Sequence, residues 1–200
     1  MLEYELPTSV ILNDTVFAIR RDGDFRMVLD CFRLLQDEEL SDIERIFACL
    51  MTFYADISSL EELDKLGDIE EAVKQMFLFF NCNQENVGAK AEGKVIDWDK
   101  DALMIISAVN KVAGKEIRAE KYLHWWTFLS YYMAIGECTL ATVVNIRRKL
   151  MKNEKLEKYE QKFVKDSPEL FNRRDNYTKD EKDFIDEIRA NWSSGGKKDG

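Results

Sequence analysis

A glycine- and lysine-containing stretch from Gly88 to Lys94 has the letters of a phosphate-binding loop up to its lysine. Such a loop cradles phosphates with backbone N–H groups and needs a serine or threonine hydroxyl after the lysine, for magnesium. Val95 occupies that place, and Glu92 would lie close to the phosphates. A polar stretch also precedes the loop, where a buried strand is required. We therefore interpret the match as chance and predict no nucleotide cofactor.

Three aspartates, Asp97, Asp99 and Asp101, alternate as they do at the start of a calcium-binding loop. That loop requires glycine at its sixth position and a bidentate glutamate at its twelfth, whereas this chain has Ala102 and Ala108 there. Carboxylates also suit the start of a helix, where they accept bonds from free N–H groups and face the positive end of the dipole. We therefore expect a helix start and no bound calcium.

The sole histidine, His124, would have to anchor any serine or cysteine triad and any histidine-based metal site. The nearest acid within a helical turn is Glu120, and a catalytic histidine also needs a nucleophile nearby. We interpret His124 as a structural residue, hydrogen-bonded at a helix surface. The cysteines are spaced too widely for a zinc site and are expected to be reduced and mostly buried: Cys31, Cys49, Cys82 and Cys138. The sequence therefore predicts a non-enzymatic protein without metal or cofactor.

Composition and charge indicate a folded, mainly helical chain with unequal halves. Hydrophobic residues make up 46% of the 200 residues and aromatic residues 12%, which is enough for a core. Residues 1–100 carry 10 basic and 22 acidic side chains, whereas residues 101–200 carry 19 and 16. The acidic half repels nucleic acid. The amino terminus does not resemble a leader and no apolar run approaches about 18 residues, so we expect a cytosolic protein without membrane partners.

The first 80 residues are predicted to form a β-hairpin followed by helices. Residues 8–20 are rich in β-forming residues around a turn at Asn13–Asp14. Asp24 is expected to cap a helix that runs to about Gln36. Three further helices are indicated by capping patterns: Ser41 with Glu44, to about Tyr54; Ser59 with Glu62, to Gly67; and Asp68 with Glu71, to Phe80.

A polar connector, residues 81–96, is predicted to separate two helical parts, residues 1–80 and 97–192. In the second part we expect helices over 98–112 (capped by Asp97), over 119–135, and from Thr139 onward. A capping pattern of Thr178 and Glu181 starts a last helix to about Trp192, and residues 193–200 are expected to be a disordered tail. The predicted fold class is mainly α, with a small amino-terminal β-hairpin followed by two packed helical bundles.

The predicted helix over 119–135 carries a wide apolar stripe. Four of its residues fall on one face at helical spacing and are predicted to be structural core: Trp125, Phe128, Leu129 and Tyr132. Trp126 and Met133 lie beside that face. Large aromatic residues at this periodicity are usually buried, and one or two rings would be left over for a partner.

A basic segment runs from Arg147 to Lys165, where eight basic residues accompany three acidic ones. Its thin apolar seam consists of Leu150, Leu156, Tyr159 and Phe163. We favour a solvated helix lying on the bundle, because charge on a helix face is commonly just solvation. The alternatives are a phosphate-binding face and a face for an acidic partner.

Several segments carry a resemblance to a known family. They are Asp-Trp-Asp-Lys-Asp at 97–101 with the run to Ala108, Leu-His-Trp-Trp-Thr-Phe at 123–128, and Ile-Arg-Arg at 146–148. The amino-terminal order also fits, with a hairpin, then Asp-Phe-Arg at 24–26, then a helix containing Glu44. Over about residues 8–165 the chain resembles the phage gene-product-fifteen family, which occurs in tail-morphogenesis gene clusters of long-tailed phages and prophages of Gram-positive bacteria.

The resemblance implies a non-enzymatic role in building the phage tail, in the cytoplasm of the bacterial host. Members of this family lie beside the major tail and tape-measure genes. The resemblance therefore implies a tail-assembly chaperone that binds the tape-measure protein, with the major tail protein as a second candidate partner. Two alternatives stay open: a minor structural component of the virion, and a nucleic-acid-binding regulator that uses residues 147–165. The sequence leaves the oligomeric state open.

If the partner is an amphipathic helix, its apolar side is expected to enter a groove lined by aromatic residues of the second half. The aromatic residues nominated for this contact are Tyr131, Tyr159 and Phe163, with Lys155, Lys158 and Lys162 around them. Apolar burial would provide most of the affinity, whereas the lysines at the rim would mainly steer association.

Overall fold

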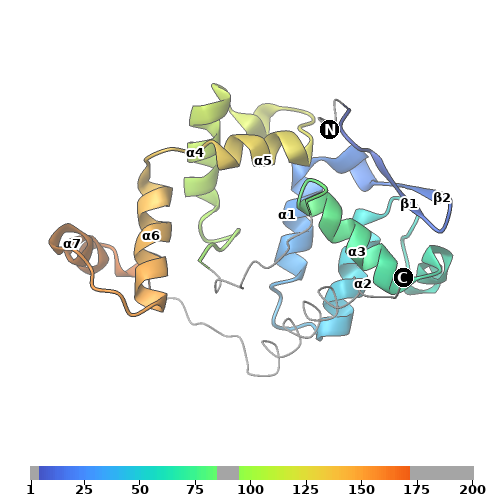
Figure 1. Cartoon of the computed structure of the whole chain (residues 1–200), viewed down its shortest axis with the longest axis horizontal. Helices are drawn as coiled ribbons and strands as arrows, with labels where there is room; N and C mark the ends of the chain where they lie inside the picture. Colours follow the sequence, from blue (N-terminus) through green and yellow to red (C-terminus); the bar gives the residue numbers. More distant parts are fainter. Residues whose placement is uncertain (1–4, 85–94, 172–200) are drawn as a thin grey trace, which may run out of the picture. The chain divides into compact units, whose positions relative to one another are not determined.

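The computed structural model describes residues 5–84 and 95–171 (Figure 1). Its elements, with 3₁₀ helices marked η, are β1 Ser9–Leu12, β2 Thr15–Ala18, η1 Arg20–Gly23, α1 Phe25–Leu34, α2 Asp42–Phe53, η2 Leu60–Leu66, α3 Ile69–Phe80, α4 Ala102–Ala113, η3 Ile117–Ala119, α5 Trp125–Met133, α6 Thr139–Met151, α7 Lys158–Asp166 and η4 Pro168–Leu170. Within these ranges the only sheet is the amino-terminal hairpin. The predicted mainly α class with a small hairpin is confirmed.

The described residues form two compact units. The first comprises residues 5–84 and 97–140, and the second comprises residues 95–96 and 141–171. Helices α4 and α5 therefore belong with the hairpin and α1–α3, whereas the sequence suggested a separate part from residue 97. The reason is packing, since the Phe25 ring of α1 stacks on the Phe128 ring of α5 with centroids 4.8 Å apart. Most of the predicted connector, the predicted helix to Trp192 and the tail 193–200 lie outside the described residues.

The hairpin is shaped by its turn and anchored by one face. Asn13 and Asp14 have φ of 48° and 63°, the left-handed values that a tight two-residue turn requires and that these residue types tolerate. Leu12 and Phe17 are buried, and the Phe17 ring packs edge-on against the Tyr54 ring, with centroids 5.9 Å apart. The hairpin is therefore fixed on the helical part of the first unit.

Side-chain caps start the first three α-helices at the predicted residues. They are Asp24, which accepts the Arg26 N–H at α1, the Ser41–Glu44 capping box at α2, and Asp68, which accepts the Glu71 N–H at α3. The expected box of Ser59 and Glu62 is different. Ser59 makes no side-chain cap bond, and the Glu62 carboxylate accepts the Ser58 N–H instead. The segment that follows is accordingly the 3₁₀ helix η2.

Aromatic rings of α2 and α3 lie at the centre of the first unit. The Phe53 ring packs against those of Tyr54, Phe79 and Phe80, with centroids between 4.9 and 5.8 Å away. The buried Tyr54 hydroxyl donates to the Ala72 carbonyl oxygen at 2.8 Å, which satisfies its hydrogen-bonding need. Hydrophobic burial of these rings holds the helices together.

Two of the four cysteines lie in this core. Cys31 of α1 and Cys49 of α2 are fully buried, and each thiol donates to the other residue's carbonyl oxygen, at Sγ–O distances of 3.9 and 3.3 Å. The hydrogen bond with Cys49 and burial raise the pKa of the Cys31 thiol, so it stays protonated. Cys82 and Cys138 are half-buried.

Helix α4 begins later than predicted. The Asp97 carboxylate accepts the N–H groups of Asp99 and Lys100 and thereby closes a turn, so the helix starts only at Ala102. It ends at Gly114, as expected, where φ of 69° is left-handed and suits glycine. An aspartate so close to a helix start can cap either a turn or the helix, and here it caps the turn.

Helix α5 is shorter than the predicted range 119–135, because it starts at Trp125 and ends at Met133. The short helix η3 takes up residues 117–119, and His124 is the N-cap of α5. Histidine is not among the preferred N-cap residues, so the sequence pattern did not indicate this start.

The basic segment 147–165 contains parts of two helices, where the sequence suggested one. Helix α6 ends at Met151, and Asn153 then adopts a left-handed φ of 52°, which stops the helix. The Glu160 carboxylate accepts the Glu157 N–H at 2.8 Å, one half of a capping box that starts α7 at Lys158.

Candidate functional site

The amino ends of α1 and α5 are joined through one buried carboxylate. The Asp24 oxygens accept the Leu123 N–H at 3.0 Å and the Arg26 guanidinium at 3.0 and 3.1 Å. The other guanidinium nitrogen of Arg26 donates to carbonyl oxygens at the end of η3, the nearest being that of Glu120 at 2.8 Å. Asp24 and Arg26 therefore connect segments that lie up to 99 residues apart in the sequence.

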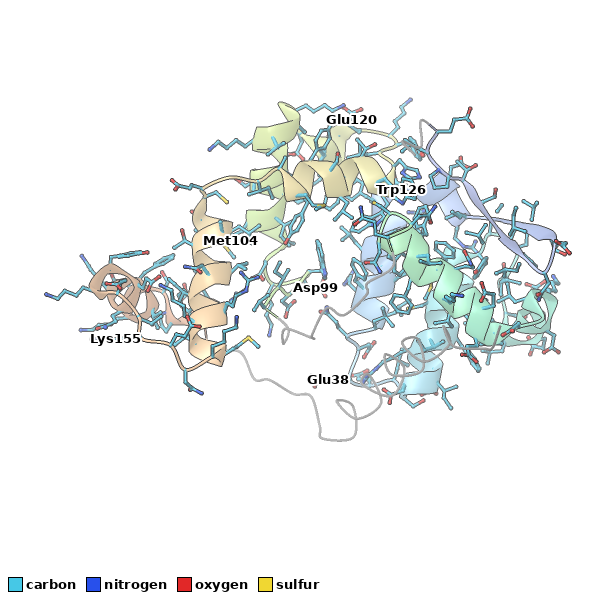
Figure 2. All side chains as sticks on the ribbon, viewed as in Figure 1. Glu38, Asp99, Met104, Glu120, Trp126 and Lys155 are labelled. Carbon is cyan, nitrogen blue, oxygen red and sulfur yellow. The ribbon has the colours of Figure 1, made fainter. Side chains whose placement is uncertain are left out.

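Two adjacent indoles of α5 bind the carboxyl end of α3. The Trp125 Nε1–H donates to the Phe80 carbonyl oxygen and the Trp126 Nε1–H to that of Phe79, both at 2.9 Å. Figure 2 shows Trp126 at the end of α5 that meets α3. The last carbonyl groups of a helix have no N–H partner further along the helix, and the Trp125 indole supplies a donor to that of Phe80. The Phe79 carbonyl oxygen also accepts the Cys82 N–H at 3.1 Å, so the Trp126 indole is a second donor to it. The two tryptophans are therefore architectural.

His124 belongs to the same junction. Its Nδ1 accepts the Trp126 N–H at 3.1 Å, which leaves the ring proton on Nε2, and that N–H donates to the Pro7 carbonyl oxygen at 3.0 Å. A Cβ at Gly23 would lie 2.9 Å from Nε2, and φ there is +77°, so the close approach requires glycine. Burial lowers the pKa of His124. His124 is thus a buried cap with both nitrogens bonded to backbone, and the predicted position at a helix surface was wrong.

We expect the free energy of unfolding to fall when the pH is lowered below about 6.5, the ordinary pKa of histidine. Burial depresses the folded-state pKa of His124, so its stabilising contribution is present above the unfolded-state pKa and lost as the pH falls through the folded-state pKa. Urea unfolding at several pH values measures this. His124→Asn keeps a capping acceptor but does not titrate, so this part of the profile should vanish. Identical pH profiles for the two proteins would contradict the proposed cap.

The four residues predicted as structural core differ in burial. Trp125 and Phe128 are 1% and 0% exposed, and their rings stack with centroids 5.4 Å apart. Leu129 and Tyr132 are half-buried. The Tyr132 ring packs against that of Trp98 at 5.6 Å. The buried face of α5 is therefore narrower than the apolar stripe of its sequence.

The aromatic residues nominated for a partner are not members of one surface. Tyr131 is half-buried on α5 in the first unit, whereas Tyr159 and Phe163 belong to α7 in the second. Phe163 is half-buried and its ring packs edge-on against Phe171, with centroids 5.6 Å apart, so it contributes to the packing of its own unit. Tyr159 is 64% exposed. Of the three nominees, Tyr159 offers the accessible ring.

Exposed lysines accompany Tyr159 on α7. Lys158 and Lys162 lie one helical turn apart, Lys165 follows them, and Lys155 precedes the helix in the loop from α6 (Figure 2). Lys162 is three residues from Tyr159, the spacing of neighbours on a helix surface. Tyr159 and these four lysines are named the basic α7 surface. It combines one large apolar ring with positive charge.

A partly buried ion pair fixes the basic α7 surface to α6. The Lys149 ammonium donates to both oxygens of Glu160, at 2.7 and 3.0 Å, and the Tyr159 hydroxyl donates to the same carboxylate at 3.3 Å. Glu160 is fully buried, and the hydrogen bond from Lys149 lowers the pKa of Glu160 while it raises that of Lys149. The spacing of Glu157 and Glu160 is that of a capping box and indicates a helix start, but no sequence pattern links Glu160 to Lys149, 11 residues earlier.

Further exposed apolar side chains lie in the first unit. Ile11 and Val16 are cross-strand neighbours on the hairpin and are 65% and 64% exposed. Leu103 on α4 and Met133 on α5 are also largely exposed. None of them lies in a strongly basic stretch of sequence, so they serve best as comparison positions for Tyr159.

The aspartates of residues 97–101 are engaged within the first unit. Asp101 is buried and accepts the Asp97 N–H at 2.9 Å, and Asp99 pairs with Arg33 at 2.8 Å. Over residues 5–84 and 95–171, no group of three or more histidine, cysteine or acidic side chains is placed to hold a metal ion. No helix in these same ranges combines the length and the apolar character needed to cross a membrane.

A family model described as Bacteriophage Gp15 protein matches residues 2–171 of the chain. The match includes every segment on which the sequence resemblance was based. Comparison with curated proteins gave no match, and comparison with solved structures gave none either.

Proposed function

We propose, because the chain belongs to the Bacteriophage Gp15 family, that it is a non-enzymatic protein of phage tail morphogenesis. More specifically, we propose a tail-assembly chaperone that binds the tape-measure protein in the host cytoplasm and leaves before the particle is complete. The state of His124 supports binding over catalysis, since both ring nitrogens are bonded to backbone groups and neither is available as a general base.

The observation that carries the binding role is the exposed ring of Tyr159 on a helix that a partly buried ion pair holds in place. A tyrosine presented in this way offers a large amphipathic contact and loses little conformational entropy when it binds. The surrounding lysines suit a segment whose apolar side is flanked by acidic residues. We propose that this segment is an amphipathic helix of the long tape-measure chain, whose apolar side must be kept from water during assembly.

In Tyr159→Ala, the complex with the cognate tape-measure protein should dissociate about tenfold faster or more, because a central aromatic contact commonly contributes more than 1 kcal/mol. Stopped-flow binding and co-purification measure this. Val16→Ala is the matched control, since Val16 is as exposed as Tyr159 but lies on the hairpin, and it should behave like the parent. An unchanged dissociation rate in a folded Tyr159→Ala protein would exclude the basic α7 surface as the main contact.

The same measurement separates apolar contact from electrostatic steering. Replacing Lys155, Lys158 and Lys162 with glutamine should slow association and flatten its salt dependence, because exposed charges are screened beyond about 8 to 10 Å at physiological salt. The dissociation rate should change little. A larger effect on dissociation than on association would mean that the lysines form buried pairs with the partner.

The alternatives for this protein have separate tests. Stoichiometric amounts in purified particles, measured by mass spectrometry, would replace the chaperone role with a structural one, and the major tail protein is the second partner to test by co-purification. A nucleic-acid role would require binding with steep salt dependence. Arg147, the first residue of the basic segment, is buried and donates to the carbonyl oxygens of Leu170 and Val95, so its charge is used within the second unit.

A further inference from the structure

The sequence beyond Phe171 has the composition of a partner for the basic α7 surface. Residues 172–200 lie outside the described residues and outside the family match. Residues 178–192 contain four large apolar residues at helical spacing: Phe184 and Ile185 are adjacent, Ile188 follows three and four positions on, and Trp192 four further. The same stretch contains five acidic residues and three basic ones. Its pattern is that of an acidic amphipathic helix.

The basic α7 surface has the complementary character. Among the described residues, no carboxylate forms an ion pair with Lys155, Lys158, Lys162 or Lys165. Tyr159 is 64% exposed beside them. An acidic amphipathic segment could cover the ring with its apolar side and place carboxylates beside the lysines. Charge and apolar character therefore agree between the two parts of the chain.

The chain also leaves the described structure next to this surface. Phe171, the last described residue, packs against Phe163 of α7. The six residues 172–177 can span at most about 20 Å. Helix α7 has nine residues and is about 14 Å long, so a segment that begins at residue 178 reaches all of it. A tether of this length gives the segment an effective concentration of about a millimolar at the surface. Even a weak contact would therefore be formed in an appreciable fraction of the molecules.

We propose that residues 178–192 bind the basic α7 surface of the same chain, with their apolar side over Tyr159 and their carboxylates near the lysines. The occupant is thus the chain's own carboxy-terminal segment. A consequence for the tape-measure protein rests on the proposed function. If that protein binds the same surface, residues 178–192 compete with it. Its apparent affinity is then the intrinsic affinity multiplied by the fraction of surfaces left uncovered.

Carbodiimide cross-linking of the full chain tests the docking directly, because this reagent joins lysine amines to carboxylates in contact. At low micromolar protein concentration we expect cross-links within the monomer band from Lys155, Lys158, Lys162 or Lys165 to acidic residues of 178–192. Monomers without such cross-links would overturn the proposal. Cross-links confined to a dimer band would also overturn it, because the occupant would then belong to a second copy.

Limited trypsin treatment provides the second measurement, through cleavage after Lys182 and Arg189 in the full chain. Both Tyr159→Ala and Ile188→Asp should accelerate this cleavage about tenfold, since cleavage follows the fraction of undocked segment. Val16→Ala is the control and should leave the rate unchanged. Ile188→Asp lies outside residues 5–171, so its result does not depend on the folding of a substituted α7. Equal cleavage rates in the parent and Ile188→Asp would overturn the docking.

These measurements use the purified chain alone, so their outcome is separate from that of the proposed function. If the tape-measure protein does not bind but the cross-links form, the docking stands and the proposed partner fails. If both hold, Ile188→Asp should bind the tape-measure protein more tightly than the parent does, by the factor by which the uncovered fraction rises. Equal affinity would show that the segment and the partner do not compete.

Discussion

Trp125→Ala should unfold the first unit or bring it close to unfolding at room temperature. The side chain is 1% exposed, stacks on Phe128 and donates to the Phe80 carbonyl oxygen. Truncating a buried tryptophan costs about 3 to 5 kcal/mol through lost burial and the cavity that remains. A domain of this size has a total stability of about 5 to 15 kcal/mol. Urea and thermal unfolding followed by far-UV circular dichroism measure the loss.

Trp126→Ala is the matched comparison for this prediction. Trp126 makes the same kind of bond, to the Phe79 carbonyl oxygen, but its side chain is half-buried. Its truncation should cost about half as much or less, because less apolar area and a smaller cavity are involved. Equal losses for the two variants would mean that the indole bonds, rather than burial, dominate. A Trp125→Ala protein that melts with the parent would show that this ring is not in the core.

Local signals were sufficient for the hairpin and for the starts of α1, α2 and α3. Aspartate and serine caps act over three residues, so the starts of α1, α2 and α3 follow from Asp24, Ser41 and Asp68. The hairpin turn follows equally well from Asn13 and Asp14, because only a few residue types tolerate left-handed φ. In these places the determining contacts lie within a few residues of one another.

The starts of α4 and α5 depend on less usual choices. Asp97 closes a turn before α4, and His124 caps α5 with an imidazole nitrogen. The Asp97 bonds are local, but an aspartate in this place suits a turn and a helix cap equally well, so the pattern alone does not distinguish them. The cap by His124 depends in addition on a tertiary contact. For His124 the contact is the Pro7 carbonyl oxygen, which lies 117 residues away in the sequence.

Long-range contacts also explain why the two units divide the chain differently from the sequence prediction. The bonds from Trp125 and Trp126 to α3 span 45 and 47 residues, across the polar stretch that suggested a boundary. Composition marks a solvated connector, but it carries no information about which helices pack on either side. The same distinction applies to the basic α7 surface. The exposure of Tyr159 could be predicted, because the sequence around it is basic and has few apolar residues. The ion pair of Lys149 with Glu160 could not, because it joins two separate helices.

Asp24→Ala should lower the free energy of unfolding by about 3 kcal/mol. The change removes the cap of α1, worth about 1 kcal/mol, and leaves the Leu123 N–H without its acceptor, which costs about 1 to 3 kcal/mol for a buried group. It also removes the ion pair with Arg26, whose contribution is reduced because the Arg26 side chain is 32% exposed to solvent. Chemical denaturation at neutral pH measures the total.

Asp24→Asn separates the charge from the hydrogen bonds. Asparagine keeps an oxygen that can cap α1, but it cannot serve Arg26 and Leu123 as a carboxylate does, so its loss should be smaller than that of alanine. In Arg26→Met the guanidinium bonds to Asp24 and to the end of η3 are both removed. The double variant Asp24→Ala with Arg26→Met should therefore cost less than the two single losses added together, because each single change already breaks their shared pair. Strict additivity would show that Asp24 stabilises the junction through the cap and the Leu123 N–H alone.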